Sequence, residues 1–267
     1  MKVYISADIE GITGVSHWDE THKCKPDFSA FAKQMTDEVS AACEGAYRAG
    51  AEEIWIKDAH ESGRNIIASS LPVYTRLIRG WSNHPLSMVQ ELDKTFSAVL
   101  FVGFHSAAGS GGNPISHTLS PEFSKIMING RKASEFLIHI YAAAMVGIPV
   151  VFISGDEEVC KEATDLNPDI QTVAVNKGIG DSVISIHPSE ALIRIKEGVE
   201  SALKRDLNIY QFSLPPYFKT ELFFKNPALA YRASFYPGMR QVSPECVLFQ
   251  SENYFEVLRM FLFALTP

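Results

Sequence analysis

The sequence predicts an α/β fold, with a largely parallel central sheet flanked by helices, on three observations. Short apolar runs rich in β-branched residues recur through the first 206 residues, helical patterns separate them, and several runs end directly in Asp, Glu or His. Strands that alternate with helices form parallel sheets, because a parallel crossover needs a connection about as long as a helix. With 267 residues, 46% of them hydrophobic, the chain is able to bury a substantial core.

The individual elements follow from the spacing of apolar residues. Residues 28–50 carry apolar side chains every four positions from Phe31 to Tyr47, which is one face of a helix, and Gly50 ends it. Residues 96–106 are almost wholly apolar, which indicates a strand buried on both faces. We expect further strands at 2–9, 52–58, 114–120, 125–130, 148–156 and 169–178, and further helices at 133–147 and 188–206.

The character of the chain changes after residue 206. Residues 1–206 form the expected α/β domain, whereas residues 207–267 carry short strand patterns at 219–224 and 246–249 and a final helix near 254–264. We expect this C-terminal region to pack on the same domain or to serve in assembly.

Charge, hydropathy and cysteine use narrow the class of protein. The net charge of −7 argues against a nucleic-acid partner, which requires a basic patch. No apolar run approaches the roughly 20 residues of a membrane helix. The first residues begin a strand and not a signal segment, so we expect a cytoplasmic protein. The four cysteines are far apart and form no CxxC pair, which argues against a zinc–thiolate site or a disulfide framework.

Acidic and imidazole side chains stand at the carboxyl ends of the expected strands. Asp8 and Glu10 follow the first strand, His60 follows the second, and the third ends at His105. Ligands bind at this edge of open α/β sheets. Residues two apart on a strand share a face, so Asp8 and Glu10 repel each other unless a cation or a proton lies between them. Carboxylate with imidazole suits zinc, manganese or iron, and we interpret the edge as a metal centre in which Asp8 can bridge two ions.

Four further positions are open to two interpretations each. Asp156 either joins this edge or caps the helix that follows it, and Asp58 either caps a turn or orients His60. Glu135 stands near a helix start, where the helix dipole favours any carboxylate. His117 is either a surface histidine or, if it faces the edge, the best-placed general acid–base, because imidazole titrates near neutral pH.

Other patterns point away from a site. The stretch AAGSGGNP at 107–114 is similar to a phosphate-binding loop but lacks the Lys-Ser/Thr pair of a P-loop, so we do not expect nucleotide binding. The remaining histidines have no convergent neighbours in the expected fold and are interpreted as structural or exposed: His17, His22, His84, His139 and His187.

Taken together, the motifs resemble the D-aminopeptidase family of binuclear zinc metallopeptidases. They are, in order, SADIEGITG, KDAHES, LFVGFHS, ISHT, INGRKASE and ISGDEE. The resemblance runs through the whole chain and is strongest over residues 1–206. It implies that His117 is the catalytic histidine and that Asp8 bridges two zinc ions in each subunit. The full set of metal ligands that it implies is Asp8, Glu10, His60, His105 and Glu135.

The resemblance also implies an activity and an assembly. The expected reaction is release of N-terminal D-residues, D-Ala above all, from short peptides, inside a homodecamer of two stacked pentameric rings. This chain departs from the family at Ser134, where Gly is common, and at Asn176 and Asp181, where the family often has basic residues. If those bases bind a substrate carboxylate, the specificity of this chain differs.

Two other functions compete with this interpretation. A dinuclear phosphoesterase uses similar Asp/His/Glu edges, but little Lys or Arg adjoins these motifs, which argues against a heavily anionic substrate. A non-catalytic peptide- or metal-binding protein linked to peptide transport is the second alternative, because a fold alone never settles a function. His117 beside all five implied ligands argues for an enzyme.

Overall fold

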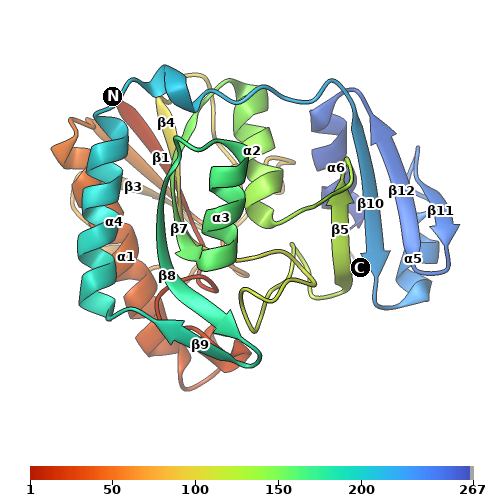
Figure 1. Ribbon diagram of the computed structural model, residues 1–267, viewed down its shortest axis with the longest axis horizontal. Helices are drawn as coiled ribbons and strands as arrows, with labels where there is room; N and C mark the ends of the chain where they lie inside the picture. The colour runs from red at the N-terminus through yellow and green to blue at the C-terminus, as the bar shows by residue number, and fades with distance from the viewer. Residues whose placement is uncertain (265–267) are drawn as a thin grey trace.

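The computed structural model describes residues 1–264 and confirms the α/β prediction (Figure 1). Its main sheet has seven strands in the order β3-β2-β1-β4-β7-β8-β9. These are β1 (Lys2–Ala7), β2 (Glu53–Asp58), β3 (Thr75–Ile78), β4 (Ala98–Phe104), β7 (Val150–Asp156), β8 (Gln171–Ile179) and β9 (Ser182–Ser185). All pairings from β3 to β8 are parallel, and only β9 runs antiparallel to its neighbour.

Helices cover both faces of this sheet. α1 (Phe28–Arg48) and α4 (Pro188–Leu203) pack on each other over one face, and α2 (Glu135–Val146) and α3 (Glu157–Leu166) lie on the other (Figure 1). Because both faces are covered, the central strands are apolar throughout, and every residue of β4 is buried as predicted. No helix among residues 1–264 is both long and apolar enough to span a bilayer.

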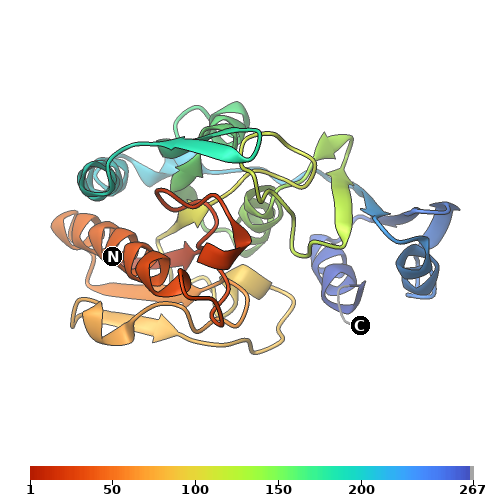
Figure 2. The same ribbon diagram turned by 90° about the horizontal axis from the view of Figure 1, so that it is seen from below.

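A second sheet of five antiparallel strands, in the order β11-β12-β10-β5-β6, lies beside the first (Figure 2). Its strands are β5 (Phe123–Ile128), β6 (Arg131–Lys132), β10 (Phe218–Phe224), β11 (Arg240–Ser243) and β12 (Cys246–Ser251), with the helices α5 (Pro227–Ala233) and α6 (Tyr254–Ala264). β5 and β6 come from within residues 1–206 and pair with the C-terminal strands. Because strands from both sides of residue 206 share this sheet, the sheet does not mark a boundary at that residue. The division of the chain at residue 206 remains a prediction.

The structure corrects one predicted strand and adds several short elements. Residues 114–120 form a loop, with only an isolated bridge between Thr118 and Ser120, and Leu119 has a positive φ of 62° that interrupts extended backbone. The strand expected at 125–130 ends two residues early, because Asn129 and Gly130 have positive φ and form the turn that joins β5 to β6. Sequence periodicity missed β3, β9, β11 and α5, which are short, and the 3₁₀ turns η1 (Trp18–Glu20), η2 (Ala68–Ser70), η3 (Ser87–Val89) and η4 (Leu207–Tyr210).

The strand order places a ligand site between β1 and β4. From β1 the chain moves outward through β2 and β3, whereas from β4 it moves the opposite way through β7 and β8. The point at which an open α/β sheet reverses its winding leaves a crevice at the carboxyl ends of the strands. The backbone after β1 enters this crevice, where the Gly11 N–H donates to the Gly103 carbonyl at 2.9 Å. A Cβ on Gly11 would collide with the Phe104 carbonyl, so glycine is required there.

Candidate metal centre

The crevice between β1 and β4 collects all six side chains singled out in the sequence. They come from the ends of β1, β2 and β4, from the loop before β5 and from the first turn of α2. Each of the five expected ligands is at most 5% exposed, and the sixth side chain is 13% exposed. The six residues are Asp8, Glu10, His60, His105, His117 and Glu135.

The Asp8 carboxylate lies between two imidazoles and faces each with a different oxygen. Its Oδ1 is 3.5 Å from Nδ1 of His60, and its Oδ2 is 3.7 Å from Nε2 of His105. Glu10 approaches the first imidazole, with Oε2 3.0 Å from Nδ1 of His60. Glu135 approaches the second, with Oε2 3.6 Å from Nε2 of His105. Two groups of donor atoms lie within 4.8 Å of one another, and they share the imidazole of His105. One group is Asp8, Glu10 and His105, and the other is His105, His117 and Glu135.

His117 lies over His105 and faces the cavity. Its ring stacks on that of His105, with centroids 4.4 Å apart and planes 14° apart. Its Nε2 is 3.6 Å from Oε1 of Glu135 and 4.0 Å from Oε1 of Glu10. The loop at 114–120, and not the predicted strand, brings His117 to the edge of the sheet.

Backbone carbonyls fix the tautomer of all three imidazoles. Nε2 of His60 lies 2.9 Å from the Thr21 carbonyl, and Nδ1 of His105 lies 2.9 Å from the carbonyl of Ser106. Nδ1 of His117 is likewise 3.1 Å from the Ile115 carbonyl. A carbonyl oxygen only accepts, so these nitrogens carry the protons. The opposite nitrogen of each ring then faces the carboxylates, and it is the nitrogen that would bind a metal ion once its proton is displaced.

The electrostatics of the cluster require positive charge. Among residues 1–264, Nε2 of His105 and Oε2 of Glu10 are buried without a hydrogen-bond partner. Burial opposes protonation of His105, but Glu135 and Asp8 outweigh it and raise its pKa to about 10. Burial likewise opposes ionisation of Glu135, but His105 and His117 lower its pKa to about 2. These carboxylates therefore demand a counter-charge, and their donor set of carboxylate oxygen and imidazole nitrogen fits zinc.

Asp58 supports the loop that carries His60 without touching its ring. The Asp58 carboxylate accepts the backbone N–H groups of Asn65 at 2.5 Å and Ile66 at 2.7 Å. The Asn65 amide donates to Asp58 at 2.9 Å and to the His60 carbonyl at 2.6 Å. Of the two sequence interpretations of Asp58, the turn cap is therefore correct, and Asn65 carries its effect to His60.

Asp156 caps a helix, as one of its two interpretations held. Its Oδ1 accepts the Val159 N–H at 2.9 Å at the start of α3, and its Oδ2 accepts the Ser106 N–H at 2.6 Å. The second bond fixes the residue that follows His105. Asp156 therefore positions the edge of the sheet without joining the cluster.

The cluster opens into a cavity of about 360 Å³. Its wall includes two histidines, His22 and His84. His84 is exposed and the His22 side chain is 39% exposed, which agrees with the sequence interpretation, but that interpretation did not place them in a cavity wall. Sequence reasoning also missed Trp18, whose ring packs against His117 at 5.1 Å, because no periodic pattern marks η1. The part of the wall outside the donor cluster includes the side chains of Trp18, His22, Glu61, Trp81, His84 and Leu262.

Backbone strain concentrates around this cavity. Non-glycine residues rarely adopt positive φ, and four wall residues do so. They are Glu61 (40°), Asn83 (60°), Ser87 (46°) and Leu119 (62°). Such conformations persist only where the surrounding structure over-determines them, which is typical of functional sites.

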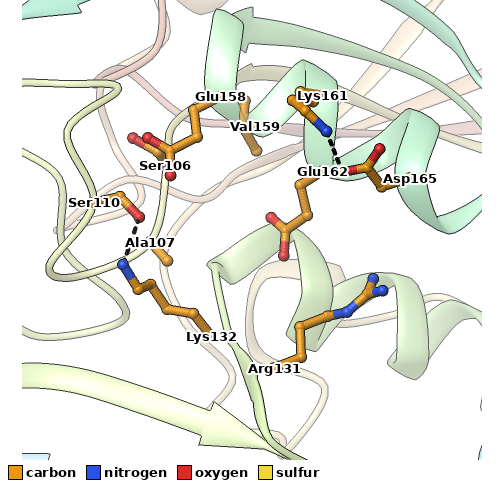
Figure 3. A pocket seen from close by; sticks show the side chains of 10 residues that line it. All are labelled: Ser106, Ala107, Ser110, Arg131, Lys132, Glu158, Val159, Lys161, Glu162 and Asp165. Carbon is orange, nitrogen blue, oxygen red and sulfur yellow. Dashed lines mark hydrogen bonds and ion pairs between the residues drawn. The ribbon is translucent and has the colours of Figure 1, made fainter.

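A second cavity of the same volume is lined in part by the segment that follows β4, at Ser106, Ala107 and Ser110 (Figure 3). Its lining contains charged side chains of both signs but no histidine, among them Arg131, Lys132, Glu158 and Glu162. In Figure 3, Lys132 points toward Ser110, and its ammonium also donates to the Gly109 carbonyl at 2.7 Å. Because it has no imidazole, this cavity offers no comparable metal site.

Comparison with known proteins identifies the family of this chain. A family model described as D-aminopeptidase matches residues 1–263. A D-aminopeptidase of Bacillus subtilis (strain 168) is 29% identical over 264 residues, which cover 98% of this chain and 96% of that protein. The solved structure of Zn-dependent D-aminopeptidase DppA from Bacillus subtilis, described as a self-compartmentalizing protease, is similar with a TM-score of 0.91. It is 28% identical, and the match covers 99% of this chain and 96% of that one. The family model spans nearly the whole sequence, and this chain therefore belongs to the D-aminopeptidase family.

Proposed function

We propose that this protein is a zinc-dependent aminopeptidase that hydrolyses the N-terminal amide bond of short peptides and prefers an N-terminal D-residue, D-Ala above all. Family membership supports the reaction class. The observation that carries the proposal is the position of Asp8, which turns one carboxylate oxygen toward each of two imidazoles. A carboxylate held in this way suits a bridge between two cations, the arrangement used in dinuclear aminopeptidases.

The contacts support two ions in each subunit. Asp8, Glu10 and His60 would hold one ion, and Asp8, His105 and Glu135 would hold the other, because these donors already face one another in pairs. Zinc, when bound, acts as a Lewis acid on a carbonyl and makes water a nucleophile at neutral pH.

His117 is the residue that moves a proton in this proposal. Its Nδ1–H is fixed on the Ile115 carbonyl, so Nε2 is the nitrogen free to exchange a proton with substrate. That nitrogen lies 4.0 Å from Oε1 of Glu10 and 3.6 Å from Oε1 of Glu135. His117 would thus hold a proton at Nε2 and deliver it to the leaving amine.

The cavity wall disfavours the phosphoesterase alternative. Within the described part of the chain, the lining side chains include no Lys or Arg to bind a phosphate. Its aromatic and imidazole wall suits a peptide better.

Chelation followed by assay tests the function. We expect the chelated protein to lose activity and zinc to restore it, with D-Ala tripeptides cleaved in preference to matched L-Ala tripeptides. Cleavage of a phosphodiester without cleavage of any peptide would contradict the proposal. Binding of peptides by the zinc-loaded protein without cleavage would identify a non-catalytic binder.

We further propose a homo-oligomer, in the form of a decamer of two pentameric rings. The description of DppA as self-compartmentalizing supports assembly. Residues 207–267, proposed to serve in it, expose the adjacent aromatic side chains of Tyr231 and Phe235. Light scattering gives the mass of the particle directly, and a monomer at micromolar concentration would contradict the proposed oligomer.

We also propose a cytoplasmic location. The four free thiols support a reducing environment of this kind, and cell fractionation tests it.

A further inference from the structure

His117 lies in a loop and takes its position from side-chain contacts, not from the ladder of a sheet. Residues 105–122 connect β4 of the first sheet to β5 of the second, with one isolated bridge between Thr118 and Ser120 (Figure 1). Nδ1 of His117 lies 3.1 Å from the Ile115 carbonyl. Whatever fixes that carbonyl therefore also fixes the direction of the imidazole.

Asn113 makes two side-chain hydrogen bonds that bear on this carbonyl. Its Oδ1 accepts the Ile115 N–H at 3.0 Å, the bond of an Asx turn. Its side-chain amide donates to the backbone carbonyl of Glu10 at 2.9 Å, across 103 positions of sequence. Asn113 is only 2% exposed, so water hardly competes for either bond. One side chain thus ties the turn before His117 to the backbone of an expected metal ligand.

The Glu10 backbone is the fixed end of this connection. The Gly11 N–H donates to the Gly103 carbonyl at 2.9 Å, and the Asp8 N–H also donates to a carbonyl of β4. Both bonds join the segment after β1 to the fully buried strand at the centre of the sheet. We therefore expect loss of the Asn113 amide to move the turn and to leave Glu10 in place.

The backbone just before Asn113 is also anchored. The Gly178 N–H of β8 donates to the Gly112 carbonyl at 3.0 Å. A Cβ on Gly178 would lie 2.6 Å from that carbonyl oxygen and 2.9 Å from the Asn113 nitrogen, so strand and loop are in close contact. Because its own backbone is held, the Asn113 side chain can impose a position on the residues that follow it.

The chain just after His117 is anchored separately, by Thr118. The Thr118 hydroxyl donates to the Ala133 carbonyl at 2.8 Å and accepts the Ala108 N–H at 3.0 Å. The turn that carries the imidazole thus lies between two anchors. Between them, the Asn113 side chain holds the turn, so its removal should leave the imidazole in the cavity with a less well-defined direction.

From these contacts we propose that Asn113 is a positioning residue for His117, because it fixes the turn whose carbonyl holds Nδ1 and thereby directs Nε2 at the metal centre. The inference rests on the proposed peptidase function, in which His117 delivers a proton to the leaving amine. Such a transfer depends on the place of the donor, and a displacement of about 1 Å costs on the order of 10²-fold in rate. Asn113 acts through His117 alone in this role.

A double-mutant cycle between Asn113 and His117 tests the inference on zinc-loaded full-length protein, with a D-Ala tripeptide as substrate. Asn113→Ala should lower kcat by about 10- to 100-fold and change KM by less than about threefold. In the His117→Ala background the same substitution should lower kcat by less than about twofold, because no imidazole remains to be directed. Zinc content, measured on the same samples, should equal the wild-type value in all variants.

Asn113→Ser is the conservative variant of this cycle. A serine hydroxyl accepts the N–H two residues later in the same kind of turn, though more weakly, and its shorter side chain gives up the bond to Glu10. It should recover kcat by at least about threefold over Asn113→Ala. Its remaining loss should also disappear in the His117→Ala background, a comparison that stands even if Asn113→Ala does not fold.

The matched control is Asn167→Ala, which removes the same two kinds of hydrogen bond elsewhere. The Asn167 amide donates to the Ile209 carbonyl at 3.0 Å, and its Oδ1 accepts the Asp169 N–H at 2.9 Å. This residue lies between α3 and the first residue of β8, at the edge of the sheet opposite the metal centre. Its substitution should leave kcat within about twofold in both backgrounds.

Three results would overturn the inference and leave the peptidase proposal intact. They are a wild-type kcat in Asn113→Ala, a loss of zinc from that variant, and an equal loss of kcat with and without His117. The last two would show that Asn113 supports the metal or the fold as a whole. Failure of the zinc-loaded wild type to cleave any D-Ala peptide would overturn the proposed function as well.

Discussion

Two cavities of this protein have the same volume, about 360 Å³, but differ in the side chains that line them. The segment after β4 touches both sites, because the His105 ring lies 3.7 Å from Asp8 in the donor cluster of the first cavity and its neighbour Ser106 lines the second. The first contains imidazoles and carboxylates that converge from four elements, and the second contains Lys, Arg and carboxylates without imidazole. The comparison teaches that cavity size does not identify a catalytic site, whereas convergence of metal-type donors at the reversal of the sheet does.

The sharpest way to test this contrast is to remove the shared carboxylate. Asp8→Asn should lose both ions, because it removes charge from the one group that faces both imidazoles. We expect kcat/KM to fall by at least about 10³-fold, since both the Lewis acid and the nucleophile are lost. Zinc content measured by mass spectrometry should fall in parallel. Full zinc occupancy in this variant would contradict the bridging role.

Removal of His117 should separate catalysis from metal binding. His117→Ala should lower kcat by about 10²- to 10⁴-fold, the range for a general acid–base, with the zinc content unchanged. Rapid-quench assays with metal analysis on the same sample give both quantities. Near-normal turnover with metal bound would show that the leaving amine takes its proton elsewhere.

Weakening the support of His60 should give a smaller effect. Asp58→Asn disturbs the two backbone bonds that hold the loop and the Asn65 side chain behind His60. Zinc affinity should fall by about 10- to 100-fold, as is usual for groups that position a ligand. Competition with a chelator of known affinity measures this. A loss of folding without a change in zinc affinity of the remaining native protein would argue for a purely structural role.

A substitution in the second cavity should change the free energy of unfolding and leave the activity nearly unchanged. Burial raises the pKa of Glu162 to about 7, although the Ser134 hydroxyl donates to its Oε2 at 2.5 Å. Because the folded pKa lies above the unfolded value, the native state binds more protons, and wild-type stability should fall as pH rises from about 4.5 to 7. Glu162→Gln should remove this pH-dependent loss in the free energy of unfolding, which is on the order of 1 to 3 kcal/mol. Its kcat/KM should stay within about twofold of the wild-type value. Urea unfolding at pH 5 and pH 8 measures it, and equal slopes in both proteins would contradict the assignment.

The sequence predicted the parts of the fold that depend on local periodicity. The run at 96–106 is a fully buried strand, because a parallel strand covered on both faces must be apolar throughout. The final helix begins at Tyr254, where its pattern does, and includes Ala264. The predicted strand at 114–120 was wrong, since Pro114 and the positive φ of Leu119 make it a loop, and alternation of polar and apolar residues is common in loops as well.

The residues of the candidate site differ in the same way in how far the sequence predicts them. The convergence of Asp8, Glu10, His60 and His105 was predicted without a structure, because parallel strands deliver their carboxyl ends to one edge. Glu135 and His117 needed the family resemblance, since a helix start and a loop have no fixed place relative to that edge. His22, His84 and Glu61 reach the cavity through connections between elements, and no local pattern predicts where such loops lie.

By itself the sequence determined the fold class and the chemical nature of the centre, because hydrophobic period and residue type are local properties of the chain. Only the tertiary structure decided which groups face one another. It set the two orientations of the Asp8 oxygens, the tautomers of three imidazoles and the position of Asn176 outside the cavity wall. Those outcomes depend on backbone carbonyls and loop paths contributed by segments distant in sequence, and on the burial that makes each unpaired charge unfavourable.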